Sequence, residues 1–159
     1  MRIVVIYASA QGCPGKSVAL IRRLLGDNCE TFNLDSGADI DLNGYETVII
    51  GGPIRFGRMP ASVQRFCQNH LAALLQRRVG LFICSMQGGG AALQELQQAF
   101  PSELLAHARA TGIFGGEIHL ERISFIERFI VRAVVRTEYS VTTFSEERVS
   151  RFLRQLLAG

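Results

Sequence analysis

The chain of 159 residues has no tryptophan, a single lysine and no pair of cysteines in a C-x-x-C arrangement. Its three histidines share no ligand spacing, so no metal site is predicted. The scattered cysteines also fit neither a zinc nor an iron–sulfur site, and we expect thiols in a reduced, cytoplasmic compartment. They are Cys13, Cys29, Cys67 and Cys84.

Long apolar runs and a strong net charge are also missing. No uninterrupted apolar run approaches the roughly 18 residues that cross a bilayer. The first residues lead directly into a strand pattern and do not resemble a signal peptide. The formal net charge is only +3, and no basic cluster is interleaved with aromatic residues, so a nucleic-acid partner is not expected.

Apolar stretches of strand length alternate with stretches of helical period along the chain. The expected strands cover residues 2–7, 30–34, 47–50, 79–84 and 111–118, and the expected helices cover residues 16–25, 60–75, 91–100, 122–136 and 146–157. This alternation predicts an α/β fold, a five-stranded parallel sheet in the order 2-1-3-4-5 with helices on both faces. We expect one domain, 1–159, with an extra helical segment at about 119–137 before the last helix.

Three loops that follow expected strands are rich in glycine or small polar residues. They cover residues 9–17, 51–59 and 85–90. In a sheet of this order a ligand binds outside the carboxyl ends of the strands, where the order reverses between the first and third strands. We therefore expect these loops to form the ligand site.

From Ala10 to Ser17 the first loop has the form A-x-x-x-x-G-K-S, which the looser phosphate-loop pattern of nucleoside triphosphatases accepts. Such an enzyme also needs a carboxylate at the end of a neighbouring strand to hold magnesium. The third and fourth expected strands lead into Gly-Gly-Pro and Ser-Met and supply no acid. A triphosphatase is therefore the weaker hypothesis.

The same loop suits a single phosphomonoester. Backbone N–H groups and the hydroxyls of Ser9 and Ser17 can surround a phosphate at the start of the first helix, where the helix dipole favours an anion. Gly12 and Gly15 permit a tight turn. Lys16 either adds positive charge or points into solvent.

Four segments resemble the flavodoxin-domain family. Residues 9–20 resemble the FMN-phosphate loop of flavodoxins and flavin reductases, and VIIGGPIRFGR at 48–58 looks like the third strand and flavin loop of the family. That family includes the menaquinone-dependent protoporphyrinogen oxidases of bacteria. MPASVQRF at 59–66 matches the helix that follows in those oxidases, and FIERFIVR at 125–132 resembles their aromatic–basic segment. The resemblance implies a flavodoxin-like fold with FMN as cofactor.

The resemblance also implies a set of cofactor contacts in the three loops. The backbone at 54–57 would contact the isoalloxazine with Phe56 beside it, although Phe56 could instead pack on the following helix. Two features depart from the family: Cys13-Pro14 displaces the usual Gly-x-Thr ending, and the loop at 85–90 has no aromatic residue. The expected cofactor-binding residues are Ser9, Gln11, Gly12, Gly15, Lys16, Ser17, Pro53, Ile54, Arg55, Phe56, Gly57, Ser85, Met86, Gln87, Gly88 and Gly89.

The expected function is that of an FMN-dependent oxidoreductase, resembling the protoporphyrinogen oxidases and using a quinone as acceptor. The alternative is a flavodoxin-type electron carrier that docks a redox partner protein and catalyses nothing alone. A third hypothesis is a binding domain that has lost the flavin. The partner is accordingly a small redox substrate or a redox protein.

The segment 118–135 mixes apolar residues with arginines. A basic amphipathic helix can lie on an anionic membrane surface, so peripheral membrane contact is one hypothesis. The other is a helix that faces the core and has a solvated arginine face.

Changing Arg128, Arg132 and Arg136 together to Gln tests the membrane hypothesis. Each arginine near an anionic surface contributes about 1 kcal/mol, so binding to anionic vesicles should fall and become less sensitive to salt. Thermal unfolding should stay unchanged. If the triple variant binds vesicles as tightly as the parent, the three arginines belong to a solvated helix face.

Overall fold

The computed structural model describes residues 1–9, 11–37, 39–115, 117–118, 141–142 and 144–158. The strands are β1 (Ile3–Tyr7), β2 (Cys29–Asn33), β3 (Thr47–Pro53), β4 (Arg78–Cys84), β5 (Ala110–Ile113), β6 (Glu117–Ile118) and β7 (Val141–Thr142). The helices are α1 (Gly12–Leu25), α2 (Ala61–Asn69), α3 (Leu71–Leu74), α4 (Gly89–Ala99), α5 (Ser102–His107) and α7 (Glu146–Leu157), with short 3-10 turns at Gly26–Asn28 and Leu34–Ser36.

The main sheet has the order β2-β1-β3-β4-β5, and every neighbouring pair is parallel. The predicted flavodoxin-like order is confirmed. A second, two-stranded antiparallel sheet pairs β6 with β7 beyond the end of β5. Among the described helices, none combines the length and the hydropathy that a membrane span requires.

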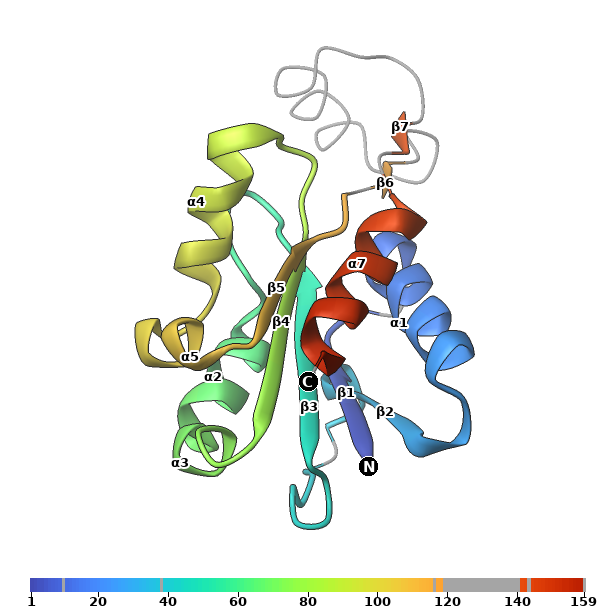
Figure 1. The fold of residues 1–159 in the computed structure, drawn as a ribbon. Helices are drawn as coiled ribbons and strands as arrows, with labels where there is room; N and C mark the ends of the chain where they lie inside the picture. Colours follow the sequence, from blue (N-terminus) through green and yellow to red (C-terminus); the bar gives the residue numbers. More distant parts are fainter. Residues whose placement is uncertain (10, 38, 116, 119–140, 143, 159) are drawn as a thin grey trace.

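Helices cover both faces of the main sheet (Figure 1). α1 and α7 lie on one face, and α2 to α5 lie on the other. Alternate strand residues point to opposite faces, so Val48 and Ile50 belong to the core under α2 to α5, whereas Ile49 belongs to the core under α1 and α7. The two cores explain why β3 is buried along its whole length.

Glycines make room for an aromatic cluster under α7. Gly51, Phe82 and Gly112 are partners in register across β3, β4 and β5. The Phe82 ring stacks on Phe114 at 4.8 Å between centroids, and Phe152 of α7 meets Phe114 edge to face at 5.3 Å. A Cβ atom on Gly51 would overlap the Phe82 ring. The absence of side chains at the glycines therefore leaves room for the Phe82 ring over Gly51 and for the Phe114 ring over Gly112.

Several expected boundaries were wrong. The first helix begins at Gly12 and not at residue 16, because Pro14 lies in its first turn, where the missing N–H costs no hydrogen bond. The expected helix 60–75 divides at His70 into α2 and α3, and the expected fifth strand ends at Ile113. α5 was not expected from the sequence. The extra helical segment expected at 119–137 lies outside the described residues.

Gly51→Ala should lower the free energy of unfolding by about 1–3 kcal/mol, the usual cost of overpacking a well-packed core. Urea unfolding measures it, and Gly90→Ala is the matched control because a Cβ there meets no atom within 4 Å. The double variant Gly51→Ala/Phe82→Leu should recover part of the loss. Unchanged stability of Gly51→Ala would contradict the proposed packing of the cluster.

Candidate functional site

The loops after β1, β3 and β4 start side by side at the carboxyl edge of the sheet, the upper edge in Figure 1. Backbone hydrogen bonds continue the sheet into these loops. The N–H of Ala8 donates to the carbonyl of Gly51 at 3.3 Å, and the N–H of Ile54 donates to the carbonyl of Cys84 at 2.9 Å. The loops that carry the expected site residues are therefore held together as one edge.

The loop after β1 ends in an open helix N-terminus. Gln11 occupies the N-cap position of α1 without a side-chain cap, and no acidic residue lies in the first turn. Gly12 has φ +65°, a left-handed conformation that favours glycine. The first N–H groups of a helix have no partner within the helix, and together with the helix dipole they favour an anion. Pro14 in this turn has no N–H to contribute.

Ser9 connects three loops at this edge. Its N–H donates to the Asp35 carboxylate that follows β2, at 2.9 Å, and its hydroxyl accepts a hydrogen bond from the Arg55 guanidinium at 3.1 Å. Ser9 also has φ +66°, which is unusual for a residue other than glycine. The contact brings a permanent positive charge from the loop after β3 to the loop that precedes α1.

The loop after β3 is a tight hairpin. Arg55 and Arg58 exchange backbone hydrogen bonds at 3.0 and 3.1 Å, and the two residues between them, Phe56 and Gly57, have φ +52° and +78°. These values fit a type I′ turn, which favours Asn-Gly and not a bulky first residue. The Phe56 side chain is 75% exposed, so it does not pack on the following helix.

The loop after β4 is held by Ser85. Its buried hydroxyl donates to the Glu95 carboxylate of α4 at 2.6 Å and accepts from the N–H of Gln87 at 3.1 Å. The Ser85 side chain thus fixes the loop, and the exposed part of the loop consists of Met86, Gln87, Gly88 and Gly89.

Ser17 is not placed as the sequence suggested. It is fully buried in the second turn of α1, and its hydroxyl donates to the carbonyl of Cys13 at 2.7 Å. Because the helix begins four residues earlier than expected, Gly15, Lys16 and Ser17 lie beyond the N-terminal turn. The structure therefore contradicts the expectation that the Ser17 hydroxyl surrounds a phosphate.

The same placement disfavours a triphosphatase. That chemistry needs a Ser or Thr hydroxyl and a nearby carboxylate on magnesium, but Ser17 is buried against its own helix. The Asp35 carboxylate lies near the end of β1, but it already accepts a hydrogen bond from the Ser9 N–H. Pro53 and Ile54 are buried, so they can offer a ligand only backbone.

The cysteine expectation was wrong for two of the four residues. Cys13 at the start of α1 and Cys84 at the end of β4 form a disulfide, with their Cα atoms 6.0 Å apart. Their sequence separation of 71 hides the pair in the sequence. Cys29 and Cys67 are free and buried. Burial raises the pKa of the Cys67 thiol to about 12 and raises that of Cys29, so both remain protonated near neutral pH.

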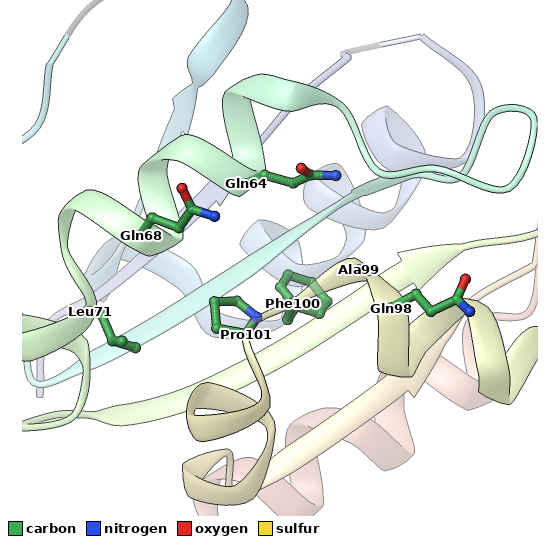
Figure 2. A pocket seen from close by; sticks show the side chains of 7 residues that line it. All are labelled: Gln64, Gln68, Leu71, Gln98, Ala99, Phe100 and Pro101. Carbon is green, nitrogen blue, oxygen red and sulfur yellow. The ribbon is translucent and has the colours of Figure 1, made fainter.

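A hollow in the surface lies away from this edge (Figure 2). Its lining comes from α2, α3 and the end of α4, and includes none of the expected site residues. The described part of the chain also contains no group of three His, Cys, Asp or Glu residues that could hold a metal ion. His70 instead stacks on Phe66 at 4.4 Å, and the Nε2 of His107 lies 2.7 Å from the carbonyl of Arg77.

A family model of the flavodoxin domain matches residues 4–144. The chain therefore belongs to the flavodoxin-domain family. It is 20% identical over 157 residues to a Leishmania major protein named protoporphyrinogen IX dehydrogenase (quinone), with 93% of this chain and 68% of that protein covered.

Two solved structures are among those similar to this chain. Rubredoxin:oxygen oxidoreductase from Desulfovibrio gigas aligns with a TM-score of 0.51 at 12% identity, covering 99% of this chain and 37% of that one. Fusobacterium nucleatum flavodoxin bound to flavin mononucleotide aligns with a TM-score of 0.46 at 20% identity, covering 69% and 68%. At 12% identity the likeness to the Desulfovibrio gigas structure concerns the fold alone.

Phe56→Asn should raise the free energy of unfolding by about 1 kcal/mol, because a left-handed conformation costs a bulky residue about that much and Asn tolerates it. Urea unfolding measures the change. Leu93→Asn is the matched control: Leu93 is 51% exposed but lies within α4, where Asn should lower stability. A loss of stability in Phe56→Asn would mean that the aromatic side chain supports the loop.

Proposed function

We propose that the protein binds FMN at the edge formed by the loops after β1, β3 and β4 and transfers electrons through it. The observation that carries the proposal is the contact between Arg55 and Ser9 beside the open N-terminus of α1. It offers one cation and one helix turn, which suits a single phosphate.

The strained hairpin at 55–58 supports the proposal that the isoalloxazine ring of FMN lies beside it. Bulky residues with positive φ concentrate at functional sites, where the surroundings maintain the strain. Phe56, next to Arg55, presents an exposed aromatic side chain on which a planar isoalloxazine can stack. The exposed glycines after Ser85 let a second loop approach the same ligand closely. When bound, FMN supplies one- and two-electron redox chemistry, and the protein supplies position and electrostatics.

The substrate proposal rests on similarity. The name of the Leishmania relative suggests a porphyrinogen donor and a quinone acceptor. Arg128, Arg132 and Arg136, which lie outside the described residues, would add contact with an anionic membrane surface. The alternative is an electron carrier that reacts only with a partner protein. Purified protein with FMN that oxidises a porphyrinogen and reduces a quinone in multiple turnovers would favour the enzyme, and flavin reduction only through a partner protein would favour the carrier.

Titration calorimetry with FMN, riboflavin, FAD and magnesium-ATP tests the cofactor proposal. FMN should bind most tightly, and its visible spectrum should shift on binding. Tight binding of magnesium-ATP without binding of any flavin would overturn the proposal.

Arg55→Gln should cost about 1.5–3 kcal/mol of FMN affinity, the value of a charge-assisted hydrogen bond to the phosphate. Riboflavin lacks the phosphate, so its affinity should hardly change. Arg58→Gln, at the other end of the same hairpin, is the matched control and should leave FMN affinity near the parental value. Equal losses for FMN and riboflavin would place Arg55 at the ring and not at the phosphate.

A further inference from the structure

The Cys13–Cys84 disulfide joins two of the three loops of the proposed site. Cys13 is the second residue of α1, in the turn whose N–H groups face the anion site, and Cys84 is the last residue of β4, directly before the loop at 85–88. The bond is therefore a covalent link between the phosphate side and the ring side of the site.

The two sulfurs are enclosed. Cys13 is 2% exposed and Cys84 is 4% exposed, and the Ser17 hydroxyl lies 3.8 Å from each Sγ. The carbonyl of Gly115 lies 2.7 Å from the Cys13 Sγ, where a thiol could donate to it. A disulfide has no such proton, so this carbonyl interacts differently with the oxidised and reduced forms.

Reduction cannot leave this arrangement unchanged. Bonded sulfurs are about 2.05 Å apart, whereas non-bonded heavy atoms need roughly 3.5–4 Å. The cysteine side chains must rotate apart when the bond breaks, and because both are enclosed in a close-packed interior, this rotation displaces their neighbours in the first turn of α1 and at the end of β4. Both segments border the proposed FMN site.

We propose that Cys13 and Cys84 are a redox-active pair whose disulfide form preorganises the site and whose reduction weakens FMN binding. The coupling to FMN rests on the proposed function, whereas the existence of the disulfide does not depend on it. Fixing a loop in its bound conformation lowers the entropic cost of binding.

The reductant is a small dithiol. One of its thiolates attacks a sulfur of the pair, the S–S bond breaks and a mixed disulfide forms. The second thiolate of the dithiol then attacks the dithiol sulfur of the mixed disulfide and releases the remaining cysteine as a thiolate. The dithiol ends as a cyclic disulfide, and its two protons are taken up by Cys13 and Cys84. Because both sulfurs are enclosed, the attack requires a local opening of the edge, which bound FMN should oppose.

Counting thiols tests the disulfide without any ligand. Protein denatured in the presence of an alkylating agent and without reductant should incorporate two labels, at Cys29 and Cys67, and four labels after reduction. Cys29→Ser is the matched control and should incorporate one label without reductant and three labels after reduction. Four labels in the unreduced parent, purified in air, would overturn the proposal.

FMN titrations of the oxidised and dithiothreitol-reduced forms test the coupling. Coupling between sites is typically 5–150-fold, and we expect FMN affinity to fall about tenfold on reduction. Cys13→Ser/Cys84→Ser should bind like the reduced parent and should not respond to dithiothreitol, whereas Cys29→Ser should respond like the parent. Coupling is reciprocal, so saturating FMN should make the pair about tenfold harder to reduce.

Equal FMN affinities of the two forms, with two labels in the unreduced protein, would assign the disulfide a structural role only and contradict the switch. No FMN binding by either form would contradict the proposed function and, with it, the coupling, while the thiol count would still decide whether the disulfide exists. The two failures are therefore distinguishable.

Discussion

The row Gly51, Phe82 and Gly112 is the packing constraint on which the rest of the structure depends. Because Gly51 and Gly112 carry no side chain, the Phe82 ring can lie over Gly51 of β3, and the Phe114 ring can lie over Gly112 of β5. Phe114 stacks on Phe82 and meets Phe152 of α7 edge to face. The row thus holds β3, β4 and β5 in register and anchors the C-terminal helix at the same time. Dispersion and burial of these rings provide a large share of the stability of that face.

This rigid face positions the proposed site. Cys84 is two residues beyond Phe82 and belongs to the same core, so a shift of β4 would move both. The disulfide to Cys13 transfers the position of β4 to the start of α1. On the other side of the sheet, Ser85 ties the following loop to α4 through Glu95. The loops at the edge are therefore fixed from both helical layers.

The sequence predicted well the order of the sheet and the meeting of three loops at its carboxyl edge, because both depend on apolar periodicity and chain order. It did not predict the start of α1, since Gly12 and Pro14 are typical loop residues. Proline is tolerated there because the first turn of a helix needs no N–H from it. It also missed the disulfide, because Cys13 and Cys84 meet only after β3 has come between β1 and β4. The contact between Arg55 and Ser9 depends on side-chain direction, which no spacing encodes.

Backbone strain gives an independent indication of where function lies. Among the described residues, only Ser9 and Phe56 adopt positive φ without being glycine, and both lie at the edge that the loops after β1 and β3 share. Arg55, next to Phe56, contacts the Ser9 hydroxyl, so the two strained residues belong to one connected group. A fold stabilised mainly by burial has no need of strain at an exposed edge. Strain there agrees with the proposed FMN site, in which Phe56, Arg55 and the first turn of α1 would face one ligand.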